Sequence, residues 1–377
     1  MPETRLIRGS YAETIYSIVG WRRDHNHMAQ THVVGCILGT AVGDALGLPY
    51  EGLSRRRAAK LLGPPDRHRF FFGHGMVSDD TEHACMVAQS LIAAGGDVDS
   101  FRRELARRFR FWLLGFPAGI GVGTLRSILR LWIGFRAEKS GVFSAGNGPA
   151  MRAAVIGAAV DNPTLPRELA RASSRITHTD PKAEFGAFTV ALATQMGRQK
   201  GTVSGHDFLD QLNSLLAPEA DELVSLICEA VNSIGDGQST IAFAELLGLS
   251  EGVSGYTYHS VPIAIHAWLS NQADFRSAVS NAIACGGDTD STGAMVGGIL
   301  GASVGKEGIP MEWLNRLFEW PRSINWMERL GAQLAGSVQS GTVDRPIKVP
   351  IYGVLPRNLF FLFLVVCHSF RRLLPPY

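Results

Sequence analysis

Residues 78–95 read SDDTEHACMVAQSLIAAG and combine a polar start, an apolar body and a glycine stop. Ser and Asp favour the first position of a helix, and glycine favours the position after its end. The apolar residues of the body recur at the spacing of one helix face: Ala84, Val87, Ala88, Leu91 and Ile92. The stretch therefore predicts a helix that begins near Ser78 and ends at Gly95.

Similar patterns recur along the chain, at 101–113, 223–234 and 275–283, and Asp180 before Pro181 predicts a further helix start. Alternating strand patterns are scarce, and neither a Pro- or Ser-rich linker nor a fixed-period repeat divides the chain. We therefore predict an all-α fold with a single large multi-helix domain over residues 33–377. Residues 1–32 lack the pattern and are predicted to be a flexible N-terminal extension.

Composition and charge exclude several classes of protein. The 377 residues are 46% hydrophobic and 19% charged with a net charge of +2, which argues against disorder, nucleic-acid binding and attraction to a membrane. The five cysteines are odd in number and far apart, so we expect neither a disulfide framework nor a structural zinc site, and a cytoplasmic location. The longest apolar run, Leu359 to Cys367, is too short to span a bilayer and is predicted to be a buried segment.

Two acidic clusters, at 78–82 (SDDTE) and 288–291 (DTDS), are the main candidates for chemistry. Helix capping explains either cluster alone, and Asp79 with Glu82 has the spacing of a capping box. Together they hold more carboxylates than two caps need, and carboxylates that converge repel one another unless cations or protons neutralise them. Oxygen donors from Asp, Ser and Thr favour Mg²⁺ or Mn²⁺ over zinc.

Weaker signals accompany these clusters. Glu51 ends a glycine-rich apolar stretch in which Asp44 is interpreted as a buried, satisfied structural carboxylate. Glycine-rich loops at 119–124 and 144–148 offer backbone N–H groups to a phosphate, although a turn between helices is slightly the better explanation of each loop alone. Neither loop is a nucleotide signature, because the first has Thr124 where the Rossmann motif requires glycine. His178 is either structural or part of a polar pocket wall.

In motif and order, segments 35–51, 78–81, 146–152, 177–180 and 286–291 resemble the ADP-ribosylglycohydrolase family. The resemblance extends from about residue 33 to the C-terminus. It implies an all-α domain with a dinuclear metal cleft that holds two divalent cations, Mg²⁺ or Mn²⁺. It also implies hydrolysis of the glycosidic bond between ADP-ribose and a protein side chain or a small acceptor.

Carried over to this sequence, the resemblance implies specific roles. Catalysis would fall to Glu51 or Asp80, with the choice of base left open. The implied metal ligands are Ser78, Asp79, Asp80, Asp288, Asp290 and Ser291, although the family often has threonine at the two serine positions. The implied substrate-binding residues are Gly119, Gly121, Gly123, Ser144, Gly146, Asn147 and His178.

Two alternatives stay open at this stage. One is a catalytically inactive relative that binds ADP-ribose or has a structural, crystallin-like role. The other is a phosphoesterase that uses the same pair of metals. The sequence does not specify the acceptor, which includes arginine, serine and acetyl groups, nor the choice between Mg²⁺ and Mn²⁺, nor the oligomeric state.

Overall fold

The helix predicted at residues 78–95 is present as α3 (Asp79–Ala94) in the computed structural model, which describes residues 29–162 and 164–375. Ser78 is its N-cap, and the Ser78 hydroxyl accepts a hydrogen bond of 3.2 Å from the Asp80 amide. Gly95 ends the helix with a φ of +56°, a left-handed conformation that a glycine adopts without steric cost. The local sequence signals thus act as predicted.

Most of the described residues belong to helices, which confirms the predicted all-α fold, and the backbone pairings among the described residues are isolated bridges without a sheet. The first described helix covers 29–47. The α-helices that follow are α2 (Arg55–Leu62), α3, α4 (Val98–Trp112), α5 (Val122–Trp132), α6 (Ala154–Ala159), α7 (Leu165–Thr177), α8 (Pro181–Lys200), α9 (Gly205–Leu216), α10 (Asp221–Gly235), α11 (Thr240–Leu246), α12 (Thr257–Ser270), α13 (Phe275–Ala284), α14 (Thr289–Val304), α15 (Met311–Leu314), α16 (Ile324–Ser340) and α17 (Ile351–Arg372). Three short 3₁₀ helices are η1 (Leu48–Tyr50), η2 (Leu113–Gly115) and η3 (Lys306–Gly308).

Helix 29–47 and α14 form the centre of the domain and touch backbone to backbone. Glycines recur every four residues on both helices, at 35, 39, 43 and 47 on the first and at 293, 297 and 301 on the second. A Cβ on any glycine of the first helix would lie 2.0–2.2 Å from a carbonyl oxygen of α14, so only glycine permits this close approach. The pair fixes where the chain emerges at Glu51 and where α14 begins.

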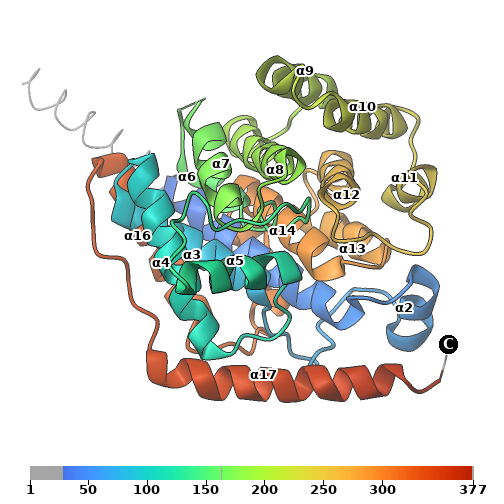
Figure 1. Ribbon diagram of the computed structural model, residues 1–377. Coiled ribbons are helices and arrows are strands. Elements are labelled where there is room, and N and C mark those ends of the chain that lie inside the picture. Colours follow the sequence, from blue (N-terminus) through green and yellow to red (C-terminus); the bar gives the residue numbers. More distant parts are fainter. Residues whose placement is uncertain (1–28, 163, 376–377) are drawn as a thin grey trace, which may run out of the picture.

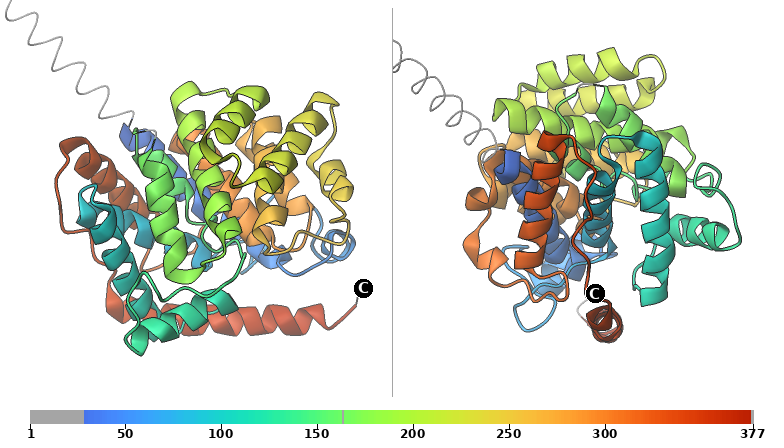
Figure 2. Two further views of the ribbon diagram at one scale, coloured as in Figure 1. Left: turned by 45° about the horizontal axis from the view of Figure 1, so that its top comes forward. Right: turned by 90° about the vertical axis from the view of Figure 1, so that its left-hand side faces the viewer.

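The other helices pack around this pair in layers. The helices α8, α12 and α13 contact α14, and α6 and α7 pack against α8 (Figure 1). The hairpin of α9 and α10 lies outside α8 and α12, while α3, α4 and α16 pack together on the opposite side (Figures 1 and 2). The N-cap predicted at Asp180 is observed, because its carboxylate accepts from the Lys182 amide at the start of α8.

The prediction that residues 359–367 form a buried segment is wrong. They belong to α17, which lies along one outer side of the domain, across the bottom of Figure 1, and contributes one narrow face to the core. Within the run Phe361 and Leu364 are buried, whereas Leu359 and Phe363 are 54% and 61% exposed. Hydropathy counts apolar residues on every face of a helix, but one that lies on the surface buries only a single face.

Two described helices are long and apolar enough to cross a membrane, judged by length and composition alone. The first covers 29–50 and is 94% buried inside the domain, which is the ordinary state of a core helix. The second is α17, which is only 22% buried.

The predicted extension at 1–32 falls mostly on residues 1–28, which lie outside the described residues, and the first helix is already formed at residue 29. The five cysteines are all free, as expected.

Candidate functional site

The two acidic clusters, some two hundred residues apart in the sequence, meet at one cleft of about 580 Å³ between the N-termini of α3 and α14. Thirteen predicted site residues contribute to its walls: Glu51, Asp79, Asp80, Gly119, Gly121, Gly123, Ser144, Gly146, Asn147, His178, Asp288, Asp290 and Ser291. Ser78 lies behind the cleft wall, and its hydroxyl donates to Asp80 Oδ2 at 2.9 Å. The structure therefore brings the predicted residues together, while their chemical roles stay predictions.

Asp44 holds the N-terminus of α3 in place. This fully buried side chain accepts from the Ser78 amide at 2.9 and 3.0 Å, from the Thr81 amide at 3.2 Å and from the Thr81 hydroxyl at 2.5 Å. Because Asp44 belongs to helix 29–47, which packs against α14, these bonds connect the two acidic helix starts through a third helix. The structural interpretation of Asp44 agrees with this geometry. Burial nevertheless raises its pKa to about 7, against the hydrogen bonds that lower it.

Glu82 does not act as a capping-box partner of Asp79. Its buried carboxylate accepts from the Trp112 indole N–H at 2.5 Å and from Arg322 Nη1 at 2.5 Å. The N-cap of α3 is Ser78, one residue before the position that the box would require. Asp79 is therefore not used for capping and faces the cleft.

One wall of the cleft, here called the acidic wall, consists of the five carboxylates of Glu51, Asp79, Asp80, Asp288 and Asp290. Burial raises the pKa of Asp79, Asp80 and Asp290 well above the usual value, and neighbouring carboxylates raise each pKa further. Glu51 lies at the solvent-exposed rim, where partial desolvation and then the charge of Asp288 raise its pKa. None of these five carboxylates forms an ion pair with a Lys, Arg or His of the described chain.

The donor set at this wall suits a hard divalent cation. Asp80 is 1% exposed, and its Oδ1 has no hydrogen-bond partner among the described residues, although a buried polar atom normally has one. Bound divalent cations would neutralise these crowded carboxylates, and a cation would also give the Asp80 Oδ1 atom the partner that it lacks. Across residues 29–162 and 164–375, no three His, Cys, Asp or Glu side chains already lie close enough together to hold an ion. The structure thus shows the cleft but not the predicted dinuclear centre.

Asp288 is oriented by Asn147 rather than used as a cap. Asn147 Nδ2 donates to Asp288 Oδ2 at 2.6 Å and lies 3.1 Å from the Ser260 hydroxyl. The backbone N–H of Asn147 donates to the Gly255 carbonyl at 2.9 Å. The Asp288 side chain makes no capping bond to α14, so capping does not explain why a carboxylate stands here. The contact between Asn147 and Asp288 joins the acidic wall to the opposite wall of the cleft, here called the glycine-rich wall, which is formed by the loops 119–124 and 144–148.

The glycine-rich wall closes around His178. A Cβ at Gly123, Gly146 or Gly148 would lie 3.0–3.1 Å from the imidazole ring, a tight contact that would require the ring to shift, so both glycine loops lie close against it. His178 Nδ1 lies 2.9 Å from the Thr177 hydroxyl. Burial, followed by the charge of Arg152, lowers the pKa of His178 to about 3, which keeps the ring neutral at physiological pH.

Sequence reasoning gave no role to two parts of the chain that shape the cleft. The first is Arg152, which is fully buried and donates to the Gly148 carbonyl, the Ser173 carbonyl and the Thr177 hydroxyl, so that it supports the loop beneath His178. An arginine directly before the apolar segment 153–160 was a usable signal. The second is the segment 253–255, which lines the cleft. It is placed by a backbone pairing with 286–288, and no local signal announces that pairing.

Comparison with known proteins assigns this arrangement to a family. The family model described as ADP-ribosylglycohydrolase matches residues 26–342. The chain belongs to the ADP-ribosylglycohydrolase family. A solved structure described as an ADP-ribosylglycohydrolase-related protein complex superposes with a TM-score of 0.61 at 27% sequence identity, covering 83% of this chain and 99% of that one.

Curated relatives agree with the ADP-ribosylglycohydrolase assignment. An uncharacterized protein of Archaeoglobus fulgidus is 33% identical over 79% of this chain and 94% of its own length. The ADP-ribosyl-[dinitrogen reductase] glycohydrolase of Rhodospirillum rubrum is 28% identical, covering 75% and 89%. The ADP-ribosylhydrolase ARH3 of Mus musculus is 27% identical, covering 74% and 85%. All residues of the cleft fall inside the region matched to the family, whereas α17 follows it.

Proposed function

We propose that this ADP-ribosylglycohydrolase is a divalent-metal-dependent hydrolase that releases ADP-ribose from a protein side chain or a small acceptor. Family membership supports hydrolysis of a bond to ADP-ribose. The observation that supports the metal requirement is the acidic wall, in which five carboxylates lie without ion pairs and one of them, Asp80, has an orphaned Oδ1. The proposed ligands are Asp79, Asp80, Asp288, Asp290 and Ser291, with Ser78 orienting Asp80 through its hydroxyl.

The chemistry of the reaction fits a site that is dense in carboxylates. Breaking the anomeric bond builds positive charge on the ribose ring, and the acidic wall stabilises that charge. The bound Mg²⁺ or Mn²⁺ ions would neutralise the carboxylates at rest and lower the pKa of a water. Two of the relatives named above are called ADP-ribosyl-[dinitrogen reductase] glycohydrolase and ADP-ribosylhydrolase, and these names support an ADP-ribosylated substrate without selecting its acceptor.

Of the two candidate bases, Glu51 fits better. Its side chain is exposed at the rim of the cleft, and its raised pKa favours acceptance of a proton that solvent can then remove. Asp80 is almost fully buried, and one of its oxygens is occupied by the Ser78 hydroxyl. We therefore assign acceptance of the proton to Glu51, and we keep Asp80 as a proposed metal ligand only.

The opposite wall is suited to the remainder of ADP-ribose. Backbone N–H groups of the loops around Gly121 and Gly146 border the cleft and offer donors to the pyrophosphate. Because the low pKa of His178 keeps its ring neutral, the ring can form a hydrogen bond with the substrate without being attracted to the acidic wall.

The test is the release of free ADP-ribose from substrates that carry it on arginine, on serine or on acetate, with Mg²⁺, with Mn²⁺ and with a chelator. We expect metal-dependent release from at least one substrate, and a loss of at least a hundredfold in kcat for Glu51→Gln. Glu229→Gln, at an exposed position of α10, is the matched control. Release of phosphate or AMP would identify a phosphoesterase. No release beside tight calorimetric binding of ADP-ribose would identify an inactive binding protein.

Metal binding is measured separately from activity. Titration of the full chain with Mn²⁺ in a calorimeter should show saturable binding that Asp290→Asn weakens at least tenfold, with Asp236→Asn on the exposed end of α10 as the control. Equal affinities for the two variants would remove the acidic wall from the proposal.

A further inference from the structure

The helix α17 carries an apolar stripe that points away from the domain. Its buried face consists of Arg357, Asn358, Phe361 and Leu364. The exposed apolar residues follow the spacing of one helix face: Tyr352, Leu355, Leu359, Leu362, Phe363, Val366 and Phe370. At about 100° per residue these seven positions fall within an arc of about 100°, on the side opposite Phe361. A helix with an apolar outer face is the reverse of what a free surface helix presents to water.

Two neighbouring loops extend this apolar surface. One is the tight turn at Phe72, which is 89% exposed, and whose neighbour Phe71 packs edge-on against Phe360 of α17. The other follows α4, where Phe116 is 69% exposed and the Gly115 carbonyl accepts from α17. In the right-hand view of Figure 2, the loop after α2, the lower end of α4 and α17 reach the same lower side of the molecule. We call α17 with these two loops the apolar side.

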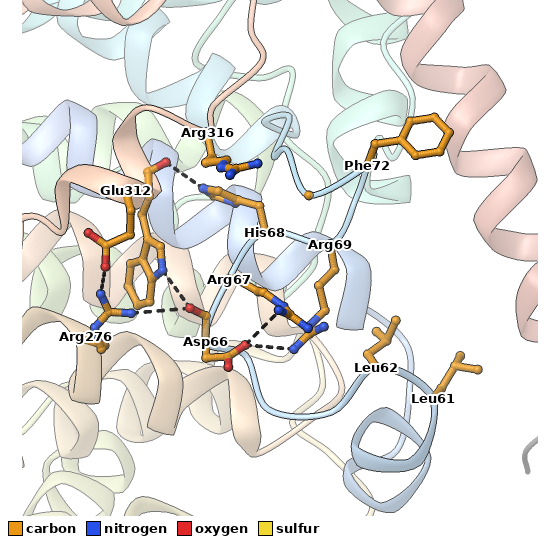
Figure 3. A pocket seen from close by; sticks show the side chains of 12 residues that line it. Leu61, Leu62, Asp66, Arg67, His68, Arg69, Phe72, Arg276, Glu312 and Arg316 are labelled. Carbon is orange, nitrogen blue, oxygen red and sulfur yellow. Dashed lines mark hydrogen bonds and ion pairs between the residues drawn. The ribbon is translucent and has the colours of Figure 1, made fainter.

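The pocket beside Phe72 does not explain its exposure. This pocket of about 680 Å³ contains paired charges, because Arg69 binds Asp66 at 2.9 Å and Arg276 binds Glu312. Phe72 points away from these side chains (Figure 3). Its ring therefore serves the apolar side rather than the pocket.

The charge of the C-terminal segment is one-sided. Residues 345–377 contain five basic side chains and no Asp or Glu, in a chain whose net charge is only +2. Three of the five, at 345, 348 and 371, are exposed. This segment begins just after residue 342, where the match to the family ends. Apolar and aromatic side chains combined with basic residues and without acids are typical of helices that lie on anionic membranes.

We propose that the apolar side docks onto an anionic lipid bilayer, with α17 lying in the plane of the interface. The stripe would enter the boundary between headgroups and acyl chains, and the exposed basic residues Arg345, Lys348 and Arg371 would meet the lipid phosphates. This reverses the expectation from net charge that the chain has no membrane partner, because the net charge averages over an uneven distribution.

The inner face of α17 keeps the helix on the domain. Arg357 donates to both oxygens of Glu319, at 2.8 and 2.6 Å, and to the Val77 carbonyl at 2.6 Å, and all of these groups are buried. A membrane-spanning α17 would move Arg357 into hydrocarbon and leave Glu319 buried without its counter-charge. A second copy on the same stripe would bring two segments that carry basic residues and no acids together across a twofold axis, so a lipid surface is the better match.

The test uses the full chain and vesicles, with Phe363→Glu/Phe370→Glu as the variant. Both phenylalanines are over 60% exposed, so their replacement leaves the core intact. We expect co-sedimentation with phosphatidylcholine–phosphatidylglycerol vesicles, at least tenfold weaker binding to phosphatidylcholine alone or at high salt, and at least tenfold weaker binding by the variant. Leu246→Glu is the control, because Leu246 is 66% exposed on α11, away from the apolar side.

Three outcomes would overturn the proposal. The first is equal vesicle binding by the variant and the wild-type protein. The second is a wild-type dimer in sedimentation that the variant converts to a monomer, which would identify a second copy as the occupant. The third is resistance of the bound protein to extraction with alkaline carbonate, which would mean that α17 leaves the domain and spans the bilayer. Circular dichroism of each variant verifies that it is folded.

Discussion

The glycine contact between helix 29–47 and α14 gives the sharpest prediction about stability. In Gly297→Ala the new Cβ would lie 2.1 Å from the Gly39 carbonyl oxygen, whereas an ordinary contact needs about 3.4 Å. The two helices must therefore separate by more than about 1 Å. Strain of this kind in a packed core costs about 1–3 kcal/mol of unfolding free energy.

The matched control is Gly336→Ala on the exposed face of α16, where nothing lies within 4 Å of the new Cβ. Alanine is favoured over glycine inside a helix by about 0.5–1 kcal/mol, so this variant should gain stability. The two alanine variants should therefore differ by about 1.5–4 kcal/mol, although they introduce the same methyl group.

Urea unfolding followed by circular dichroism measures the difference, with the slope of the transition compared as well as its midpoint. Gly297→Ala should also bind Mn²⁺ more weakly, because the same contact sets the position of Glu51 relative to Asp290. If Gly297→Ala unfolds at the same urea concentration as Gly336→Ala or at a higher one, the backbone contact does not hold the two helices in place, and our account of how the cleft is assembled fails.

Three further predictions concern single groups. Arg357→Met should lower the unfolding free energy by about 3–5 kcal/mol in thermal or urea denaturation, because Glu319 stays buried without its partner. His266, whose pKa burial lowers to about 4, stays neutral in the folded protein while the unfolded chain takes up a proton below pH 6.5. Stability should thus fall by about 2 kcal/mol from pH 7 to 5 through this group, and His266→Gln should flatten the measured slope. Gly148→Ala should weaken calorimetric ADP-ribose binding about tenfold, since its Cβ would press on the His178 ring at 3.1 Å.

Much of the fold could be predicted because the helix signals are local. The apolar spacing of 78–95, its Ser78 cap and its Gly95 stop all act within one helix, and tertiary contacts do not contradict them. The pairing of helix 29–47 with α14 was also present in the sequence, as glycines four residues apart in both segments, but that spacing has meaning only when the two segments are compared.

The site could be predicted in part for the same reason. An excess of carboxylates over helix caps indicated that the clusters around Asp80 and Asp290 serve more than capping, and the structure places both clusters in one cleft. The segment 253–255 could not be predicted, because it reaches the cleft through backbone bonds to a distant strand-like segment. The exposure of α17 could not be predicted either, since composition does not reveal which face of a helix meets the domain.

The contact between Arg357 and Glu319 also matters for dividing the chain. The match to the family ends at residue 342, so a truncation there would keep every residue of the cleft. Yet the counter-charge of Glu319 and the donor to the Val77 carbonyl come from α17, beyond that boundary. Val77 immediately precedes the acidic cluster of α3, so Arg357 of α17 holds the segment from which the carboxylates of that cluster extend. A chain cut at residue 342 would therefore lose contacts that stabilise the catalytic domain, although it would keep the whole region matched to the family.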